Sequence, residues 1–359
     1  MPAENEMINV VVLRDVPQTD LDRIEAVAPG RIKATGIWRG VRAELAKTFP
    51  EEQLRRFERT TEPVPAPPAE ETARVLAEAQ VLYSGAVHPA DLIRRMPKLR
   101  WAHFTMAGVS TIRPSEFWDS HVPVTSSRGH TAALPIAELA MAGGMALAKN
   151  IPTAVRQTGA QSFDPRAFMP KMISGKTLGV IGLGGIGMHL ARIGKGLGMR
   201  VVGSKRSITQ RGPGEDGVDE LFPASELAEM LAQCDFIGVC TPLTAQTENL
   251  LDEAALAACK QGVIIMNIAR GEIIHEPSLI AALASGHVGG AYMDVYSGEE
   301  DGQPPNPALL ALPNVVLTPH IGFKSDVSHM FAMDLFRDNL RRFVAGEPLV
   351  NIIDWERGY

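Results

Sequence analysis

The stretch KTLGVIGLGGIG, residues 176–187, decides the fold of this chain. A β-forming apolar run ends in Gly182-Leu183-Gly184-Gly185-Ile186-Gly187, and helix-forming residues follow at once. A strand, a G-x-G-x-x-G turn and a helix in this order are typical of a dinucleotide site. Gly182 allows the tight turn, Gly184 lets the backbone approach a pyrophosphate, and Gly187 permits close packing of helix on strand. The helix N-terminus would face the negative charge of the pyrophosphate.

Further strands and helices alternate after this turn. Apolar runs at 177–182, 200–204, 236–240, 262–268, 289–295 and 314–318 read as strands. Most are separated by helical stretches, at 188–198, 225–233, 252–260 and 277–286. Nearly continuous Val/Ile runs joined by helices are what a parallel sheet covered on both faces requires. This half of the chain therefore predicts a doubly wound α/β domain.

A separate α/β series precedes the turn. Strands are expected at 8–13, 79–85, 99–104 and 122–127, with amphipathic helices at 51–60 and 69–79. A length of 359 residues also suggests two domains. The segment 31–70, which ends in a proline-rich connector at 61–68, matches no pattern we can place. The apolar, Gly- and Ala-rich helix 134–150 joins the two series, either as a core helix or at a domain or subunit interface.

Composition excludes several classes of function. The net charge of −6 gives no electrostatic footprint for nucleic acid or anionic membranes. The N-terminus lacks the pattern of a signal peptide, and no apolar run is long enough to span a bilayer. The three cysteines, Cys234, Cys240 and Cys259, have neither disulfide nor zinc spacing. We therefore expect a soluble cytoplasmic protein without a metal site.

The end of the strand 200–204 bears on the choice of dinucleotide. NAD sites usually place an Asp or Glu there, which binds the ribose 2′-hydroxyl. This chain instead has Ser204-Lys205-Arg206-Ser207, whose charges and hydroxyls would hold a 2′-phosphate. A solvated basic turn is the plain alternative. The sequence favours NADP over NAD.

Polar residues follow three of the later strands. Arg270 comes directly after 262–268, Asp294 ends 289–295 with Glu299 five residues later, and His320 follows 314–318. Ligands of open parallel sheets bind at the carboxyl ends of the strands. We therefore expect these side chains to converge beside the nicotinamide end of the dinucleotide.

Their chemistry suits hydride transfer to a ketone. Negative charge develops on the carbonyl oxygen, and a protonated His320 can donate a proton to it. Glu299 would hold the imidazole ring and favour its charged form, while Arg270 offers a planar fork for a substrate carboxylate. The set predicts reduction of a 2-oxo acid to a 2-hydroxy acid, or the reverse reaction.

Four motifs together resemble those of the D-isomer-specific 2-hydroxyacid dehydrogenases. They are VIGLGGIG (180–187), NIARGEII (267–274), DVYSGE (294–299) and TPHIG (318–322), within a match over roughly 79–345. The resemblance implies a Rossmann coenzyme domain, residues 131–321, inserted into a flavodoxin-like substrate domain, residues 1–130 plus 322–359. It also implies a homodimer built through the coenzyme domains, with a dimerisation helix near 134–150.

The resemblance further implies residue roles. Arg270 would bind the substrate carboxylate, Glu299 would partner the histidine, and His320 would be the acid/base. Met106, Ala107 and Gly108 match a loop whose backbone N–H groups bind that carboxylate. Residues Trp101, Phe104, Met106 and Phe323 are expected near the walls of the cleft. The implied dinucleotide-binding residues are Gly182, Gly184, Gly185, Ile186, Gly187, Ser204, Lys205, Arg206, Ser207, Cys240, Thr241, Pro242, Thr247, Ile268, Ala269, Arg270, Asp294, His320 and Gly322.

Several alternatives stay open at this point. Family members usually have Glu-Pro where this chain has Glu299-Glu300, so either carboxylate could face His320. Formate dehydrogenases share the fold, but their histidine is partnered by glutamine. A corepressor-type binding protein could keep the same residues and use the dinucleotide to control partner binding, although the short C-terminus here favours an enzyme. An inactive scaffold is a third alternative, and the substrate side chain is not fixed.

Overall fold

The computed structural model describes residues 6–49, 51, 54, 66–106, 112–118, 120–128, 132–299, 301–326 and 328–356. The chain divides into two compact units. Unit 1 comprises Met1–Thr131 and Val327–Tyr359, and unit 2 comprises Ala132–Asp326. Residues 322–326 thus belong to unit 2, contrary to the predicted boundary, because the Asp294 carboxylate accepts a hydrogen bond from the Gly322 backbone N–H.

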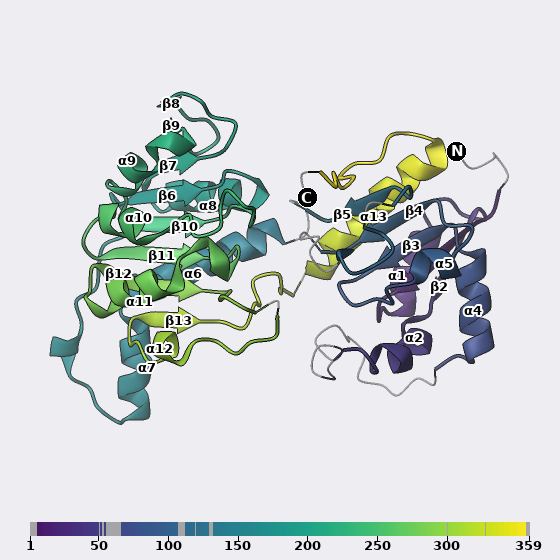
Figure 1. The fold of residues 1–359 in the computed structure, drawn as a ribbon, viewed down its shortest axis with the longest axis horizontal. Helices are drawn as coiled ribbons and strands as arrows, with labels where there is room; N and C mark the ends of the chain where they lie inside the picture. The colour runs from purple at the N-terminus through teal and green to yellow at the C-terminus, as the bar shows by residue number, and fades with distance from the viewer. Residues whose placement is uncertain are drawn as a thin grey trace. The chain divides into compact units, whose positions relative to one another are not determined.

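Unit 1 is built on a five-stranded parallel sheet with the order β2-β1-β3-β4-β5. This is the flavodoxin-like order, which confirms the predicted fold. The strands are β1 (Ile8–Leu13), β2 (Ile32–Gly36), β3 (Val81–Ser84), β4 (Trp101–Phe104) and β5 (Val124–Ser126). The helices are α1 (Gln18–Glu25), α2 (Trp38–Leu45), α4 (Ala69–Glu78), α5 (Leu92–Arg95) and α13 (Ser328–Ala345). The last of these returns from the C-terminal part of the chain and packs on the sheet (Figure 1).

Unit 2 contains an eight-stranded sheet with the order β13-β12-β11-β10-β6-β7-β9-β8. From β6 onward this is the Rossmann order, extended by β13 at one edge and by the short antiparallel β8 at the other. The strands are β6 (Thr177–Ile181), β7 (Arg200–Ser204), β8 (Gly212–Pro213), β9 (Glu220–Phe222), β10 (Phe236–Val239), β11 (Val263–Asn267), β12 (Val288–Met293) and β13 (Val315–Leu317). The α-helices are α6 (Ala133–Ala148), α7 (Ile151–Gly159), α8 (Gly185–Gly196), α9 (Leu227–Leu231), α10 (Glu253–Ala258), α11 (Glu276–Ala284) and α12 (Pro307–Leu310).

The helix α6 lies inside unit 2. A methyl group on Gly143 would overlap the Tyr292 ring, and one on Gly144 would overlap the Met266 sulfur. These glycines therefore let α6 approach β11 and β12 closely, and Ala137 and Ala140 are also fully buried. These contacts fit the core-helix reading, and a place for this helix at a subunit interface stays a prediction.

Six strands of unit 2 coincide with the predicted apolar runs to within a few residues, whereas β8, β9 and parts of unit 1 were not predicted. The elements β2 and α2 occupy the beginning of the unplaced segment 31–70, and α13 was not predicted either. Most of the predicted helix 51–60 lies outside the described residues. In the part of the chain that the structure describes, no helix is long and apolar enough to cross a membrane.

Candidate active site

The glycine turn between β6 and α8 has the geometry that a dinucleotide requires. Gly182 has a φ of +97°, and a methyl group there would lie 2.8 Å from the Thr241 nitrogen. A methyl group on Gly187 would overlap the Gly182 carbonyl oxygen. Gly184, in contrast, borders open space, because a methyl group there would meet no atom within 4 Å. The backbone is thus closely packed at Gly182 and Gly187 and borders open space at Gly184. This leaves room for a pyrophosphate at the start of α8.

The basic turn follows β7 directly. Ser204 is buried, and its carbonyl oxygen accepts a hydrogen bond of 2.8 Å from the Gly182 N–H, which joins this turn to the glycine turn. Lys205, Arg206 and Ser207 are exposed. Two cations therefore stand beside the glycine turn, where a carboxylate would be expected for NAD.

The loop after β10 carries four more predicted residues. The Cys240 N–H donates to the Ile181 carbonyl at 2.8 Å, so the loop begins beside the glycine turn. Burial raises the pKa of the Cys240 thiol to about 12, so the sulfur is an unreactive thiol at neutral pH. Thr247 Oγ1 donates to the Pro242 carbonyl at 2.6 Å and accepts from the Thr244 N–H at 2.8 Å. Thr247 thus shapes the loop that contains Thr241 and Pro242.

Arg270 stands in a turn that a buried asparagine holds. Asn267, the last residue of β11, is fully buried. Its Nδ2 donates to the Arg270 carbonyl at 2.8 Å, and its Oδ1 accepts from the Ala269 N–H at 3.1 Å. Ile268 is also buried and packs in the core. Sequence reasoning missed Asn267, although it opens the NIAR motif.

His320 and Glu299 are in direct contact. His320 Nδ1 lies 2.9 Å from Glu299 Oε1, and their side chains are 33% and 17% exposed. A carboxylate that is ionised can only accept hydrogen bonds, and Nδ1 is the donor to Glu299 in that state. Nε2 is then the ring atom that can exchange a proton with a ligand. The ring of Phe323 lies edge-on to the imidazole, with 6.3 Å between ring centroids.

The backbone of His320 is strained, with a φ of +50°. The carboxylate of Asp294 at the end of β12 holds this turn in place. Its Oδ1 accepts from Thr318 Oγ1 at 2.6 Å and from the Ile321 N–H at 2.9 Å. Its Oδ2 accepts from the Gly322 N–H at 2.7 Å, and a methyl group on Gly322 would lie at that same distance from Oδ2. Asp294 is 2% exposed, and its carboxylate holds the His320 turn through these hydrogen bonds.

The three strand-end loops contact one another. Gly298, next to Glu299, donates its N–H to Glu272 Oε1 at 2.9 Å. A methyl group on Gly271 would overlap the backbone between Tyr296 and Ser297, so the turn after Arg270 packs against the loop that leads to Glu299. The strands β11, β12 and β13 are neighbours in the sheet. The structure therefore brings Arg270, Glu299 and His320 to the carboxyl ends of neighbouring strands of unit 2.

Comparison with known proteins now identifies the family. The model of "D-isomer specific 2-hydroxyacid dehydrogenase, NAD binding domain" matches residues 141–322. The chain belongs to this family. The expected family is thereby confirmed, and the expected fold agrees with that of solved relatives.

Individual relatives differ in length and in activity. The chain is 35% identical over 277 residues to D-3-phosphoglycerate dehydrogenase of Rattus norvegicus, a match that covers 77% of this chain and 50% of that protein. It is 31% identical over 271 residues to a glyoxylate reductase of Korarchaeum cryptofilum, covering 74% of this chain and 80% of that one. The chain thus spans about half the length of the phosphoglycerate dehydrogenases it matches.

A crystal structure of a D-isomer specific 2-hydroxyacid dehydrogenase from Xanthobacter autotrophicus Py2, in complex with NADPH and MES, superposes with a TM-score of 0.73. The two chains are 25% identical, and the match covers 98% of this chain and 100% of the other.

Some of the predicted site residues are not seen at the site, either because the structure does not describe them or because they are buried. Ala107, Gly108 and Glu300 lie outside the described residues. Met106 is partly buried, and its carbonyl accepts from the Ser127 N–H at 3.0 Å. Trp101 and Phe104, expected near the walls of the cleft, are fully buried in the packed interior of unit 1 and line no surface themselves. Large rings at these strand positions are used for packing instead: Trp101 stacks on Phe336, with 5.3 Å between centroids.

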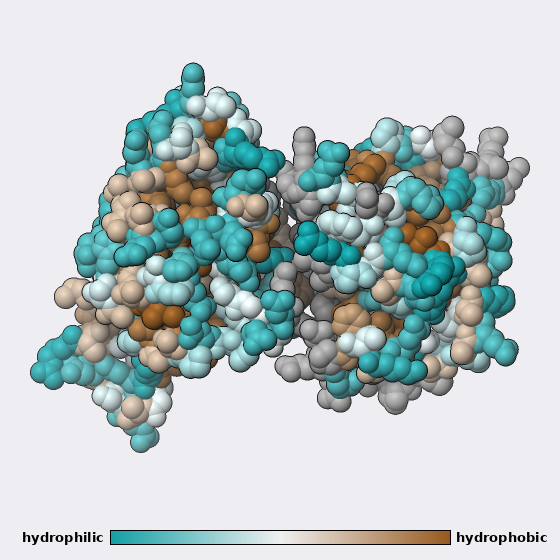
Figure 2. Space-filling model, in the orientation of Figure 1, coloured by the Kyte–Doolittle hydropathy of each residue, from teal (hydrophilic) through white to brown (hydrophobic). Residues whose placement is uncertain are grey.

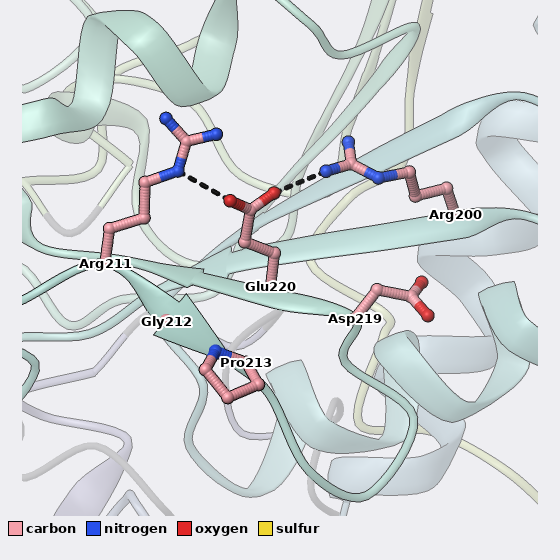
Figure 3. A pocket seen from close by; sticks show the side chains of 6 residues that line it. All are labelled: Arg200, Arg211, Gly212, Pro213, Asp219 and Glu220. Carbon is pink, nitrogen blue, oxygen red and sulfur yellow. Dashed lines mark hydrogen bonds and ion pairs between the residues drawn. The ribbon is translucent and has the colours of Figure 1, made fainter.

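A surface pocket of about 520 Å³ at the edge of the large sheet is not the dinucleotide site. It includes Arg200, which begins β7, whereas the basic turn follows the opposite end of that strand. Its two arginines, Arg200 and Arg211, both contact the carboxylate of Glu220 (Figure 3), which neutralises much of their charge. Among the described residues, no group of three or more His, Cys, Asp or Glu side chains could hold a metal ion.

Proposed function

We propose that this chain reduces a small 2-oxo acid to the D-2-hydroxy acid, or catalyses the reverse, with His320 as the acid/base. The hydrogen bond of 2.9 Å between His320 and Glu299 carries this proposal, together with the Arg270 turn beside it. A bound dihydronicotinamide supplies the hydride. The glycine turn, open in front of Gly184, would hold the pyrophosphate of that dinucleotide.

Each side chain has a separate task in this proposal. During reduction the substrate carbonyl oxygen gains negative charge, and His320 Nε2 gives it a proton, a contribution of ~10²–10⁴ in rate. Glu299 orients the ring and stabilises the imidazolium form through its negative charge. Arg270 binds the substrate carboxylate with its planar fork and polarises the carbonyl group. Asp294 keeps the His320 turn in its strained conformation.

Unit 1 is proposed as the substrate domain, with the loop of Met106, Ala107 and Gly108 as a second contact for the carboxylate. The bond from the Ser127 N–H to the Met106 carbonyl supports a fixed start for this loop. We also place the chain in the cytoplasm. All three cysteines are free, which suits a reducing compartment.

Steady-state oxidation of NADPH and of NADH across a panel of 2-oxo acids tests the activity. Glyoxylate, hydroxypyruvate, pyruvate and bulkier 2-oxo acids form the panel, and formate with oxidised dinucleotide is the control for a formate dehydrogenase. Turnover with at least one 2-oxo acid is expected. Tight dinucleotide binding without any turnover would contradict the proposal and favour a dinucleotide-regulated binding protein.

We propose NADP as the preferred dinucleotide. The exposed Lys205 and Arg206 beside the glycine turn support it, because a 2′-phosphate gains from both cations. Replacing both with serine should weaken NADPH binding far more than NADH binding. Arg192→Gln is the matched control, since Arg192 on α8 is exposed and paired with Asp216. Equal weakening of both dinucleotides would exclude this role.

We propose a homodimer in which the segment after α6 contacts the partner. No residue of α7 is buried, and the helix projects from unit 2 (Figure 1). Figure 2 shows hydrophobic residues beside hydrophilic ones on this part of the molecule. Exposed apolar side chains gather here: Ile151 (49%), Val155 (66%), Phe163 (82%), Met169 (83%) and Met172 (66%). Such a patch is typical of a protein–protein interface.

Light scattering during size exclusion tests the dimer. The wild type should elute with twice the chain mass, and a Val155→Asp/Phe163→Asp variant should elute as a monomer. Leu310→Asp is the control, because Leu310 is similarly exposed (54%) on α12. A monomeric wild type, or a variant with unchanged mass, would contradict the proposal.

A further inference from the structure

Glu272 connects three of the loops that follow the strands of unit 2. It lies in the 3₁₀ turn η4 (Gly271–Ile273), which begins directly after Arg270. Its backbone carbonyl accepts a hydrogen bond of 2.8 Å from the Asn249 N–H, in the loop after β10. Its side-chain Oε1 accepts a hydrogen bond of 2.9 Å from the Gly298 N–H, in the loop after β12. Glu272 thus joins the turn after β11 to the loops on both sides of it.

Gly298 is the central residue of the loop that carries Glu299. Its carbonyl accepts hydrogen bonds from the Asp301 N–H at 3.1 Å and from the Gln303 N–H at 3.0 Å. Its φ of +81° is a conformation that favours glycine. These bonds join residues of the loop to one another, whereas the bond to Glu272 ties the loop to a neighbouring strand end. A hydrogen bond from a backbone N–H to a carboxylate is charge-assisted and therefore strong.

The position of Glu299 depends on this connection, because Glu299 is the next residue in the chain. Its Oε1 must stay within hydrogen-bond distance of His320 Nδ1, which it contacts at 2.9 Å. Gly298 is partly buried, so its N–H would lose a protein acceptor if the Glu272 carboxylate were removed. The loop would then shift to regain a partner for this N–H. A displacement of about 1 Å at a reacting group can cost ~100-fold in rate.

We propose that Glu272 is a positioning residue for the candidate acid/base pair. Through the Gly298 backbone it holds Glu299 in contact with His320. The inference rests on the proposed function for its effect on turnover, but not for the contact between the two side chains. The Glu272 carboxylate serves as a hydrogen-bond acceptor, so an amide oxygen in the same place should serve as well.

The turnover of two variants with the best 2-oxo acid tests this role. Glu272→Ala removes the acceptor, and kcat should fall by ~10–100-fold. Glu272→Gln keeps an acceptor oxygen, and its kcat should stay close to that of the wild type. The KM for the 2-oxo acid should change little in both variants, because the backbone bonds of the Arg270 turn are kept. Equal kcat values for the two variants would overturn the proposal.

The control variant is Glu276→Ala. Glu276 is also partly buried, and its Oε1 accepts a hydrogen bond of 2.8 Å, but from Asn306 Nδ2 at the start of α12. Removing this carboxylate should leave kcat at the wild-type value. The Tm of every variant is measured as well, so that a loss of stability is separated from a loss of position. A fall of kcat in Glu276→Ala as large as that in Glu272→Ala would overturn the proposal.

The double variant Glu272→Ala/Glu299→Ala distinguishes positioning from a general effect on the fold. If Glu272 acts through Glu299, its removal should have no further effect once Glu299 is absent. The kcat of the double variant should therefore equal that of Glu299→Ala. A further loss as large as the one that Glu272→Ala causes in the wild type would overturn the proposal.

A wild type that turns over no 2-oxo acid would contradict the proposed function, and NMR then tests the inference alone. In ¹⁵N-labelled protein, the ring nitrogens of His320 show which of them carries the proton when the ring is neutral. The wild type and Glu272→Gln should have this proton on Nδ1, facing Glu299, and Glu272→Ala should shift it toward Nε2. The same ring spectrum in Glu272→Ala as in the wild type would overturn the inference.

Discussion

A single carboxylate, that of Asp294, holds the candidate acid/base in position. It accepts hydrogen bonds from Thr318 Oγ1 and from the backbone N–H groups on the C-terminal side of His320. Tyr292 continues the network, with its hydroxyl 2.8 Å from Thr318 Oγ1. A non-glycine residue at positive φ persists only where its surroundings fix it, and these bonds do so.

Asp294→Asn should therefore change the backbone conformation of His320, although Asp294 bonds only to the residues around it. The amide replaces one acceptor oxygen with a donor, which would face a backbone N–H, so we expect a loss of ~1–3 kcal/mol in stability. The rate constant kcat should fall by at least ~10-fold, as it does when the supporting contacts of a reactive group are lost. Dinucleotide affinity and Tm are measured alongside kcat. Asp301→Asn, at an exposed turn, is the control. An unchanged kcat would show that Asp294 does not position His320.

The residues with reacting side chains could be predicted, but those that hold them could not. Arg270, Glu299 and His320 each follow an apolar run, and parallel strands bring such positions together. Asn267 and Thr318 serve through bonds to backbone or to Asp294. A buried polar residue at a strand end has no periodicity of its own, so its partner becomes visible only in three dimensions. The choice between Glu299 and Glu300 likewise depends on a contact in three dimensions, which the structure gives for Glu299.

At the scale of elements, the contact between β6 and α8 depends on the absence of one side chain. Gly187 lies in the first turn of α8, and a methyl group there would overlap the Gly182 carbonyl oxygen. The backbone of the glycine turn cannot move away freely, because Gly182 is itself confined by Cys240 and Thr241. The strand, the turn and the helix are therefore closely packed against one another.

Gly187→Ala and Gly196→Ala form a matched pair within α8. Gly187→Ala should lower Tm and weaken dinucleotide binding, since overpacking costs ~1–3 kcal/mol. At Gly196 a methyl group would meet nothing within 4 Å, so Gly196→Ala should be neutral or stabilise by ~0.5–1 kcal/mol through helix propensity. Thermal unfolding and dinucleotide titration of both variants check this. Equal Tm values for the two variants would contradict the packing role of Gly187.

Strands that are buried on both faces could be predicted from the sequence, whereas an exposed edge strand could not. The central strands β6, β10 and β11 of unit 2 are buried on both faces, which produces continuous apolar runs. In β2, an edge strand, only Ile32 is buried, so the run was too short to recognise. The helix α13 did carry a signal, since Met333, Phe336 and Leu340 recur with helical spacing and pack on the sheet of unit 1. This spacing is the periodicity of an amphipathic helix.

At the scale of the whole molecule, unit 1 should make stability depend on pH. Its buried His88 and His103 have pKa values lowered from 6.5 to about 4 and about 3, chiefly by burial. His103 is held neutral between Thr125 Oγ1 at 2.8 Å and Ser127 Oγ at 3.1 Å. The folded state thus excludes a proton that the unfolded chain binds below pH 6.5.

The free energy of unfolding should rise with pH, because the folded state binds fewer protons than the unfolded chain. The contribution is fully present above pH 6.5 and is lost as pH falls toward 4 and 3, by up to ~1.4 kcal/mol per pH unit for each histidine. Denaturant titrations between pH 7 and pH 5 should show decreasing stability in the wild type and a smaller decrease in His103→Gln. His121→Gln, at an exposed position, should keep the wild-type slope. An unchanged slope in His103→Gln would mean that this residue is not held neutral.

The most direct test of the central claim is the turnover of His320→Ala with the best 2-oxo acid, measured beside its dinucleotide affinity. If His320 is the acid, turnover should fall by ~10²–10⁴-fold, while dinucleotide affinity stays close to that of the wild type. His121→Ala, which removes an exposed histidine of unit 1, should behave as the wild type in both measurements. Wild-type turnover in His320→Ala would contradict the role assigned to His320 and, with it, the mechanism proposed for this chain.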